Sequence, residues 1–198
     1  GPQFSSLNKF TKLTRGKKIF GKLEKFTLES DIDKHGKIGQ QLTKGQLLPV
    51  QIVKEPISTK GQRLSCELSL AGRYLVLVPF SKAVNASKKI TSNEERKRLL
   101  RLIQSIKPEN FGVIIRTVAE GAEVAELDKD LRNLVKTWED GIARLPEAQP
   151  NEKLIGELNK TSSILRDLLN ESFDNIHIDV KKIYDEARAY IRNISPEQ

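Results

Sequence analysis

The alternation of apolar and polar residues in the first half of the chain predicts β-strands. An extended apolar run from Leu47 to Val53 contains Pro49, which favours an edge or bulged strand. Apolar residues then alternate over residues 64–70, as in a half-buried strand. Residues 74–78 are nearly all apolar, which predicts a central strand that ends at Pro79.

A helix and another strand are expected next. Ser92, with a glutamate three residues later, fits a capping box, so a helix should begin there and carry leucines and isoleucines along one face. Residues 111–115 (FGVII) predict a short buried strand that runs directly into Arg116 and Thr117. The order strand, strand, helix, strand predicts a compact α+β unit over residues 64–117.

The second half of the chain has mainly helical periodicity. From residue 123 to residue 145, apolar residues recur every three or four positions, which predicts a long amphipathic helix. The stripe covers only about three heptads and includes Gly141, so packing against its own domain is favoured over pairing with another chain. Beyond the PEAQP boundary, residues 153–159 and 173–180 read as strands, each followed by a helix, which predicts a βαβα block.

Charge is distributed unevenly along the chain. The net charge of +8 is made up of +13 over residues 1–120 and −5 over residues 121–198. Binding to a polyanion, if it occurs, therefore belongs to the first part. Within residues 1–25 the lysines alternate with phenylalanines, which is typical of single-strand nucleic-acid binders but equally of a solvated tail or part of a barrel.

Several classes of protein are disfavoured by the composition. A single cysteine, Cys66, excludes a disulfide framework and a cysteine-based zinc site within this chain. No apolar run reaches the ~20 residues of a membrane span, and no signal peptide is apparent, so a cytoplasmic location is expected. His35 and His177 do not suggest catalysis, and Asp174 and Asp179 point to opposite faces of a predicted strand. With no phosphate-binding glycine loop either, the residues indicate a basic binding module.

Arg116 raises the question of which anion it meets. A guanidinium at the end of a buried strand carries five donors that need acceptors. From the residues alone, an ion pair with Glu120 or Glu123 is the favoured role.

A succession of motifs resembles the ribonuclease E/G family of bacterial endoribonucleases. In chain order the motifs are GQLLPVQIVKEPISTKGQRL, SLAGRYLVLVP, ITSNEERKRL, GVIIRTVAEG, VKTWED, LIGELN and ILRDLLNESFDNIHID. The resemblance covers about residues 40–195. It implies an α+β architecture in three parts: the end of an OB-fold RNA-binding domain with a basic insertion (1–56), a 5′-sensor unit with the long helix (57–146), and part of a ribonuclease H-like subdomain (147–198).

The resemblance also implies roles for individual residues. Arg116 and Thr117 occupy the positions of the pair that binds a 5′-monophosphate. For Arg116, the resemblance therefore favours phosphate binding over an ion pair. Gly72 and Val76 occupy positions that give backbone contacts to the terminal nucleotide. Lys60 occupies the position of a lysine that contacts RNA between the barrel and the sensor.

The expected partner is single-stranded RNA with a 5′-monophosphate, in RNA processing and mRNA decay. The family's cleavage centre uses Mg²⁺, and a cysteine pair shares Zn²⁺ between subunits of a homo-oligomer; both are expected downstream of this chain. No catalytic residue and no metal site is therefore expected in these residues, and the chain alone is expected not to cleave RNA. Two alternatives stay open: a generic basic RNA-binding module, and an interaction module that uses the 123–145 helix.

Overall fold

The computed structural model describes Leu23, Lys37, Gly39, Leu42 and residues 44–156, 160–169 and 173–194. The chain divides into two compact units, with the division between Leu154 and Ile155. Unit 1 contains every strand found in the described residues together with helices α2 and α3, and unit 2 contains two helices. The mixed content confirms the predicted α+β class.

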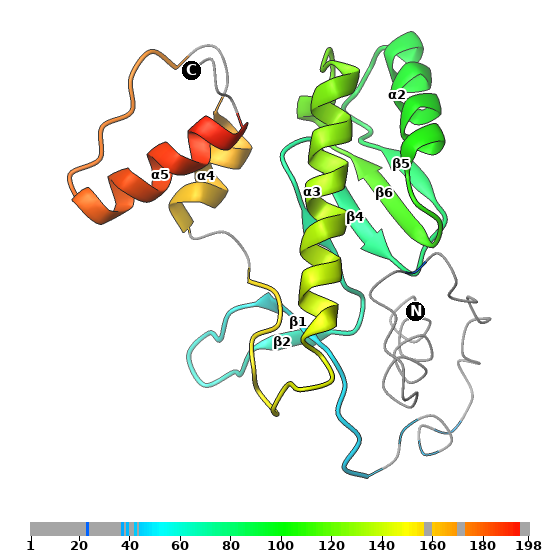
Figure 1. The fold of residues 1–198 in the computed structure, drawn as a ribbon, viewed down its shortest axis with the longest axis vertical. Coiled ribbons are helices and arrows are strands. Elements are labelled where there is room, and N and C mark those ends of the chain that lie inside the picture. Colours follow the sequence, from blue (N-terminus) through cyan, green and yellow to red (C-terminus); the bar gives the residue numbers. More distant parts are fainter. Residues whose placement is uncertain are drawn as a thin grey trace. The chain divides into compact units, whose positions relative to one another are not determined.

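A four-stranded sheet forms the centre of unit 1 (Figure 1). Its strands lie in the order β3 (Leu70–Ala71), β4 (Leu75–Pro79), β6 (Phe111–Ile115) and β5 (Val84–Ala86). The pairs β3–β4 and β4–β6 are antiparallel, and β5 runs parallel to β6. The two apolar runs predicted as buried strands are thus the two inner strands, each of which is hydrogen-bonded to a neighbour on both edges.

Helices α2 (Asn93–Ile106) and α3 (Val124–Ala143) pack against this sheet (Figure 1). Ser92 caps α2, because its hydroxyl accepts a hydrogen bond of 3.3 Å from the N–H of Glu95. The return half of the predicted capping box is absent, since the Glu95 carboxylate instead bonds Arg98 at 2.7 Å.

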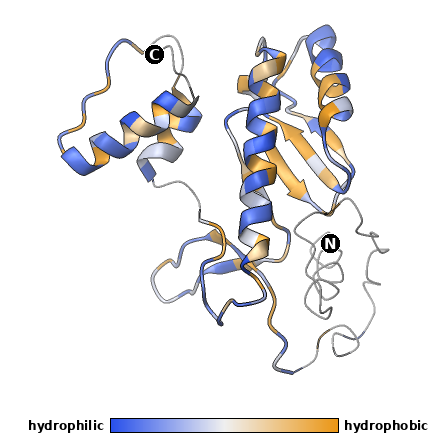
Figure 2. Cartoon of the chain, in the orientation of Figure 1, coloured by the Kyte–Doolittle hydropathy of each residue, from blue (hydrophilic) through white to orange (hydrophobic). Residues whose placement is uncertain are grey.

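The apolar stripe of α3 is buried within its own unit, which confirms the favoured interpretation. Trp138, Phe80 and Phe111 meet edge to face, with ring centroids 5.6 and 6.3 Å from the tryptophan. Figure 2 shows the apolar residues gathered in β4 and β6 and on the inner side of α3. Other fully buried side chains of this core are Leu75, Leu77, Leu99, Ile103, Ile115, Leu127 and Leu131.

The opposite face of the sheet is open. Register places Val76 of β4, Ile114 of β6 and Asn85 of β5 in one row across the strands. Their neighbours Leu75 and Ile115 are fully buried, whereas Ile114 is 42% exposed and Asn85 is exposed. Because side chains alternate along a strand, this row marks the uncovered face.

The single strand predicted over residues 64–70 is instead divided between two sheets. Strands β1 (Gln51–Lys54) and β2 (Arg63–Ser65) form a separate antiparallel pair with an irregular register, in agreement with the bulge predicted near Pro49. After β2 the chain bends, since the Ser65 hydroxyl accepts the Glu67 N–H at 3.0 Å. The Gln51 side chain then bonds both backbone groups of Ser69, at 2.9 and 3.0 Å, and β3 begins at the next residue.

Strand β5 lies in a segment for which no strand was predicted. It is only three residues long and sits among lysines and small residues, so it has little local signal. Its partner is β6, with Val84 opposite Val113 and Ala86 opposite Ile115. This distant parallel pairing, and not local propensity, establishes the strand.

Unit 2 contains α4 (Lys160–Leu168) and α5 (Lys181–Ile194). The two helices were expected, but the strands predicted with them are not found in residues 153–156 and 173–180 of the described chain. Alternating apolar residues indicate a strand only where a neighbour supplies hydrogen bonds, and Ile176 is 38% exposed with no strand of the described residues beside it.

The predicted part of an OB-type barrel falls largely outside the described residues, as does the basic segment 1–25 apart from Leu23. Within the described part of residues 1–56, β1 is the one strand present. None of the described helices has the length and apolar character that crossing a bilayer requires.

Candidate functional site

Arg116 is held at the end of β6 by backbone groups from the β3–β4 turn. Its N–H donates to the Tyr74 carbonyl at 2.8 Å, which extends the ladder by one residue. Its guanidinium Nη1 donates to the carbonyls of Gly72, at 2.8 Å, and Arg73, at 3.2 Å. The residue is half-buried, and the bonds to these two carbonyls fix the guanidinium in place.

Asp130 of α3 binds the backbone of the same β3–β4 turn. Its carboxylate accepts the N–H groups of Arg73 (3.2 Å), Tyr74 (2.9 Å) and Leu75 (3.0 Å). Burial raises the pKa of Asp130, although the three N–H donors and the charge of Arg116 oppose that rise. The positive charge of Arg116 therefore acts on Asp130, an acid that the sequence did not single out.

Gly72 is required by this arrangement for steric reasons. A Cβ at this position would lie 2.5 to 2.8 Å from the carboxylate atoms of Asp130. Any larger residue would have to displace a carboxylate that is bonded to three amides. Gly72 therefore allows the turn to close on Asp130 while its own carbonyl binds Arg116.

A pair of hydroxyls lies where β5 and β6 end. Thr117 Oγ1 and Ser87 Oγ are 2.9 Å apart, and the Ser87 N–H donates to the Ile115 carbonyl at 2.8 Å. Parallel strands end at the same edge of a sheet, so Thr117 and Ser87 meet there although 30 positions separate them. Arg96 of α2 donates to the Ser87 carbonyl at 2.9 Å and ties the start of the helix to this edge.

The charge around the hydroxyl pair is positive. Lys88 and Lys89 follow Ser87, are exposed, and form no ion pair with any residue that the structure describes. Within the described ranges, no group of three or more His, Cys, Asp or Glu side chains could hold a metal ion. Guanidinium, hydroxyl and ammonium donors favour an anion with several oxygen acceptors, such as a phosphate.

Val76 is the second residue of β4 and so lies close to this edge of the sheet. Since the Arg116 N–H bonds the Tyr74 carbonyl, the alternation of the antiparallel ladder also points the peptide groups of Val76 toward its partner Ile114. The half-buried Val76 side chain is on the open face of the sheet next to Ile114.

Lys60 is separate from the other candidate residues. It lies in the turn of the β1–β2 hairpin, where its backbone N–H and carbonyl pair with Ile57 at 3.0 and 3.1 Å. It is exposed and shares no hydrogen bond with Gly72, Val76, Arg116 or Thr117. The structure thus joins Gly72, Arg116 and Thr117 at one edge, with Val76 on the adjacent strand.

Two residues of the site were not identified from the sequence. Ser87 follows strand β5, which was not predicted from the sequence. Asp130 adjoins the apolar stripe of the long helix, between Leu127 and Leu131, and an acid at such a position was the available signal.

Comparison with known proteins gives consistent matches. The model of the ribonuclease E/G family matches residues 69–198. Ribonuclease G of Escherichia coli (strain K12) is 36% identical over 160 residues, which cover 81% of this chain and 33% of the relative. Ribonuclease E of Nostoc sp. is 36% identical over 165 residues, or 81% of this chain and 23% of the relative. The chain thus spans about a third of the length of the ribonuclease G relatives and less of the ribonuclease E relative.

Proposed function

The chain belongs to the ribonuclease E/G family, and on that basis we propose that unit 1 binds single-stranded RNA and senses a 5′-monophosphate at Arg116 and Thr117. The observation that carries the proposal is that the guanidinium of Arg116, held by the Gly72 and Arg73 carbonyls, shares one edge of the sheet with the Thr117–Ser87 hydroxyl pair and two exposed lysines.

The chemistry of a phosphate suits these donors. A terminal monophosphate carries up to two negative charges and three acceptor oxygens. The guanidinium of Arg116 has five donors, so its bonds to two carbonyls are compatible with a further bond to a phosphate oxygen. Either hydroxyl of the Thr117–Ser87 pair can rotate to donate to a second oxygen.

The expected selectivity follows from hydrogen-bond energies. A charge-assisted bond contributes about 1.5 to 3 kcal/mol, so one or two such bonds favour a phosphorylated end over a hydroxyl end by about tenfold or more. In place of the expected backbone contacts to the terminal nucleotide, Gly72 would hold the arginine through its carbonyl. Val76, whose peptide groups face Ile114, would offer the nucleotide its apolar side chain. Lys60 would contact RNA away from this edge, through the hairpin.

The wider role is also proposed from the family. The whole protein would be a cytoplasmic, homo-oligomeric endoribonuclease of RNA processing and mRNA decay, with Mg²⁺ and Zn²⁺ bound by residues outside this chain. The described residues contain no group of three or more His, Cys, Asp or Glu side chains that could hold a metal ion, and we assign them no metal-dependent step.

A generic RNA-binding module without end sensing is the second candidate, favoured by the exposed lysines alone. Pairing of the α3 stripe with another chain is not supported, because that stripe is buried in unit 1.

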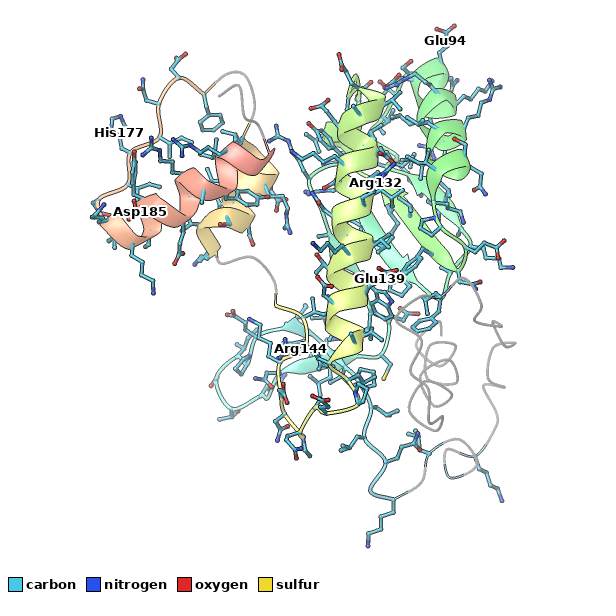
Figure 3. All side chains as sticks on the ribbon, in the orientation of Figure 1. Glu94, Arg132, Glu139, Arg144, His177 and Asp185 are labelled. Carbon is cyan, nitrogen blue, oxygen red and sulfur yellow. The ribbon has the colours of Figure 1, made fainter. Side chains whose placement is uncertain are left out.

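The test compares binding of two short single-stranded RNAs that differ only in a 5′-monophosphate or a 5′-hydroxyl. Wild type should prefer the phosphate by about tenfold, and Thr117→Val and Arg116→Lys should each reduce that ratio. Arg132→Ala is the matched control: Arg132 lies on α3, as Figure 3 shows, and carries the same charge in an exposed pair with Asp128. Equal binding of both RNAs by wild type would refute end sensing and leave the generic module.

A further inference from the structure

Helix α2 carries a group of exposed cations that the proposed 5′ site does not use. Residues 82–107 contain eight lysines and arginines against two glutamates. Lys97 and Arg101 lie four residues apart, so their side chains project from the same side of the helix. Together with Glu94 and Arg98 they line a shallow hollow on the surface.

The individual charges of the helix have different roles. Arg98 is committed to the fold, because it bonds both oxygens of Glu95 at 2.7 Å and the Ala122 carbonyl at 3.0 Å. Lys97 and Arg101 are exposed and form no ion pair with any described residue. Their positive charge is therefore not neutralised within unit 1.

Hydrogen bonds connect the start of the helix to the proposed phosphate site. Arg96, next to Lys97, bonds the Ser87 carbonyl, and Ser87 in turn bonds Thr117. Lys88 and Lys89 lie in the connection between Ser87 and the helix. In chain order, cations thus run from the site to the third turn of α2. We call this series of Lys88, Lys89, Lys97 and Arg101 the basic strip.

We propose that the basic strip binds the phosphodiester backbone of the RNA whose 5′ end occupies the Arg116 site. The inference deepens the proposed function, because it takes RNA as the ligand and assigns a path to the nucleotides that follow the first one. A strip of this kind holds phosphates without reading bases, so it would add affinity to every RNA regardless of its 5′ group. Recognition of the 5′ end would then belong to Arg116 and Thr117, and grip on the RNA body to Lys97 and Arg101, with Lys88 and Lys89 between the two.

The test measures RNA binding by the whole chain at several salt concentrations. Lys97→Ala with Arg101→Ala is compared with a control that removes two exposed lysines elsewhere in unit 1, Lys136→Ala with Lys153→Ala. For an RNA of about twelve nucleotides, the strip variant should bind roughly fivefold to twentyfold more weakly with either 5′ group. The slope of log affinity against log salt should become shallower by about 1.4, since each phosphate contact on a single strand contributes about 0.7.

Two further measurements sharpen the test. An RNA of about three nucleotides should bind the strip variant and wild type alike, because it does not extend beyond the 5′ site. Glu94→Gln, at the exposed start of α2 in Figure 3, should strengthen binding of the longer RNA, since it removes a negative charge from the hollow.

The two proposals fail in different ways. Unchanged affinity and salt slope in the strip variant would refute RNA binding by the basic strip, whatever the 5′ preference is. An acidic protein partner would then be the alternative ligand of these cations. Loss of affinity with an unchanged ratio between the two 5′ groups would support it. If wild type shows no 5′ preference but the strip variant still loses affinity, end sensing fails while the strip stands.

Discussion

Replacing Gly72 with alanine should destabilise the protein through a single contact. The added Cβ would lie 2.5 Å from one oxygen of Asp130 and 2.6 Å from the other, well inside van der Waals contact. The carboxylate cannot move without losing bonds to the amides of Arg73, Tyr74 and Leu75. A small substitution should therefore have a large effect.

The magnitude follows from the bonds that the carboxylate gives up. A partly buried amide left without an acceptor costs about 1 to 3 kcal/mol, and the site is accessible enough for water to offset some of this. With one or two bonds lost, we expect Gly72→Ala to lower the free energy of unfolding by about 2 to 4 kcal/mol. The φ of Gly72 is not in the left-handed region, so backbone strain adds nothing, and alanine alone would stabilise by about 0.4 to 1 kcal/mol through the unfolded chain.

Urea denaturation of wild type, Gly72→Ala, Asp130→Ala and the double variant tests this account. Asp130→Ala removes the obstacle, so Gly72→Ala should be neutral or slightly stabilising in that background, with a coupling energy of about 2 kcal/mol or more. If Gly72→Ala costs the same whether or not Asp130 is present, the steric explanation is wrong. The 5′-phosphate preference should fall in Gly72→Ala, because the Gly72 carbonyl holds Arg116.

Three further predictions concern other parts of the chain. Hydrogen bonds from Arg98, and then from the Gly121 N–H, lower the pKa of Glu95 from 4.5 to about 2, so the stability that Glu95 contributes should be present above about pH 4.5 and lost toward pH 2. In Glu95→Gln, the free energy of unfolding should therefore depend less on pH across that interval. An unchanged dependence on pH would contradict the pairing. Trp138→Ala should lower the free energy of unfolding by about 3 to 5 kcal/mol in denaturant titrations, since the ring is fully buried against Phe80 and Phe111; a loss below 1 kcal/mol would show that the core repacks. The purified chain should not cleave RNA when Mg²⁺ is added, because we propose that the family's Mg²⁺-dependent cleavage centre is formed by other residues, and magnesium-dependent cleavage on a gel would refute this.

Local patterns predicted the parts of the fold that have strong periodicity. The inner strands β4 and β6 are continuous apolar runs, and α3 repeats apolar residues every three or four positions, so all three elements were identified with nearly correct bounds. The position of Arg116 and Thr117 at a strand end followed directly from the end of β6. Ranges 153–159 and 173–180 show the opposite case, since an alternating pattern was taken for strands where the described residues have no partner to pair with.

The candidate site was only half predictable for a related reason. Asp130 lies 57 positions from the first amide that it accepts, and a lone acid on a helix gives no sign of where its acceptor oxygens are used. Ser87 depends on β5, whose three residues become a strand only beside β6. Residues whose role is to hold other residues by long-range bonds leave little trace in local sequence.

The shared use of the Asp130 carboxylate also has a consequence for motion. One side chain covers the amide hydrogens of Arg73, Tyr74 and Leu75, so a single torsional rotation of that side chain would uncover all three together. Their exchange with solvent deuterium would then follow one common opening rate, distinct from the rate of the strand ladder between β4 and β6. Because the same turn carries the carbonyls that hold Arg116, this rate would measure how often the guanidinium loses its support while the sheet stays intact.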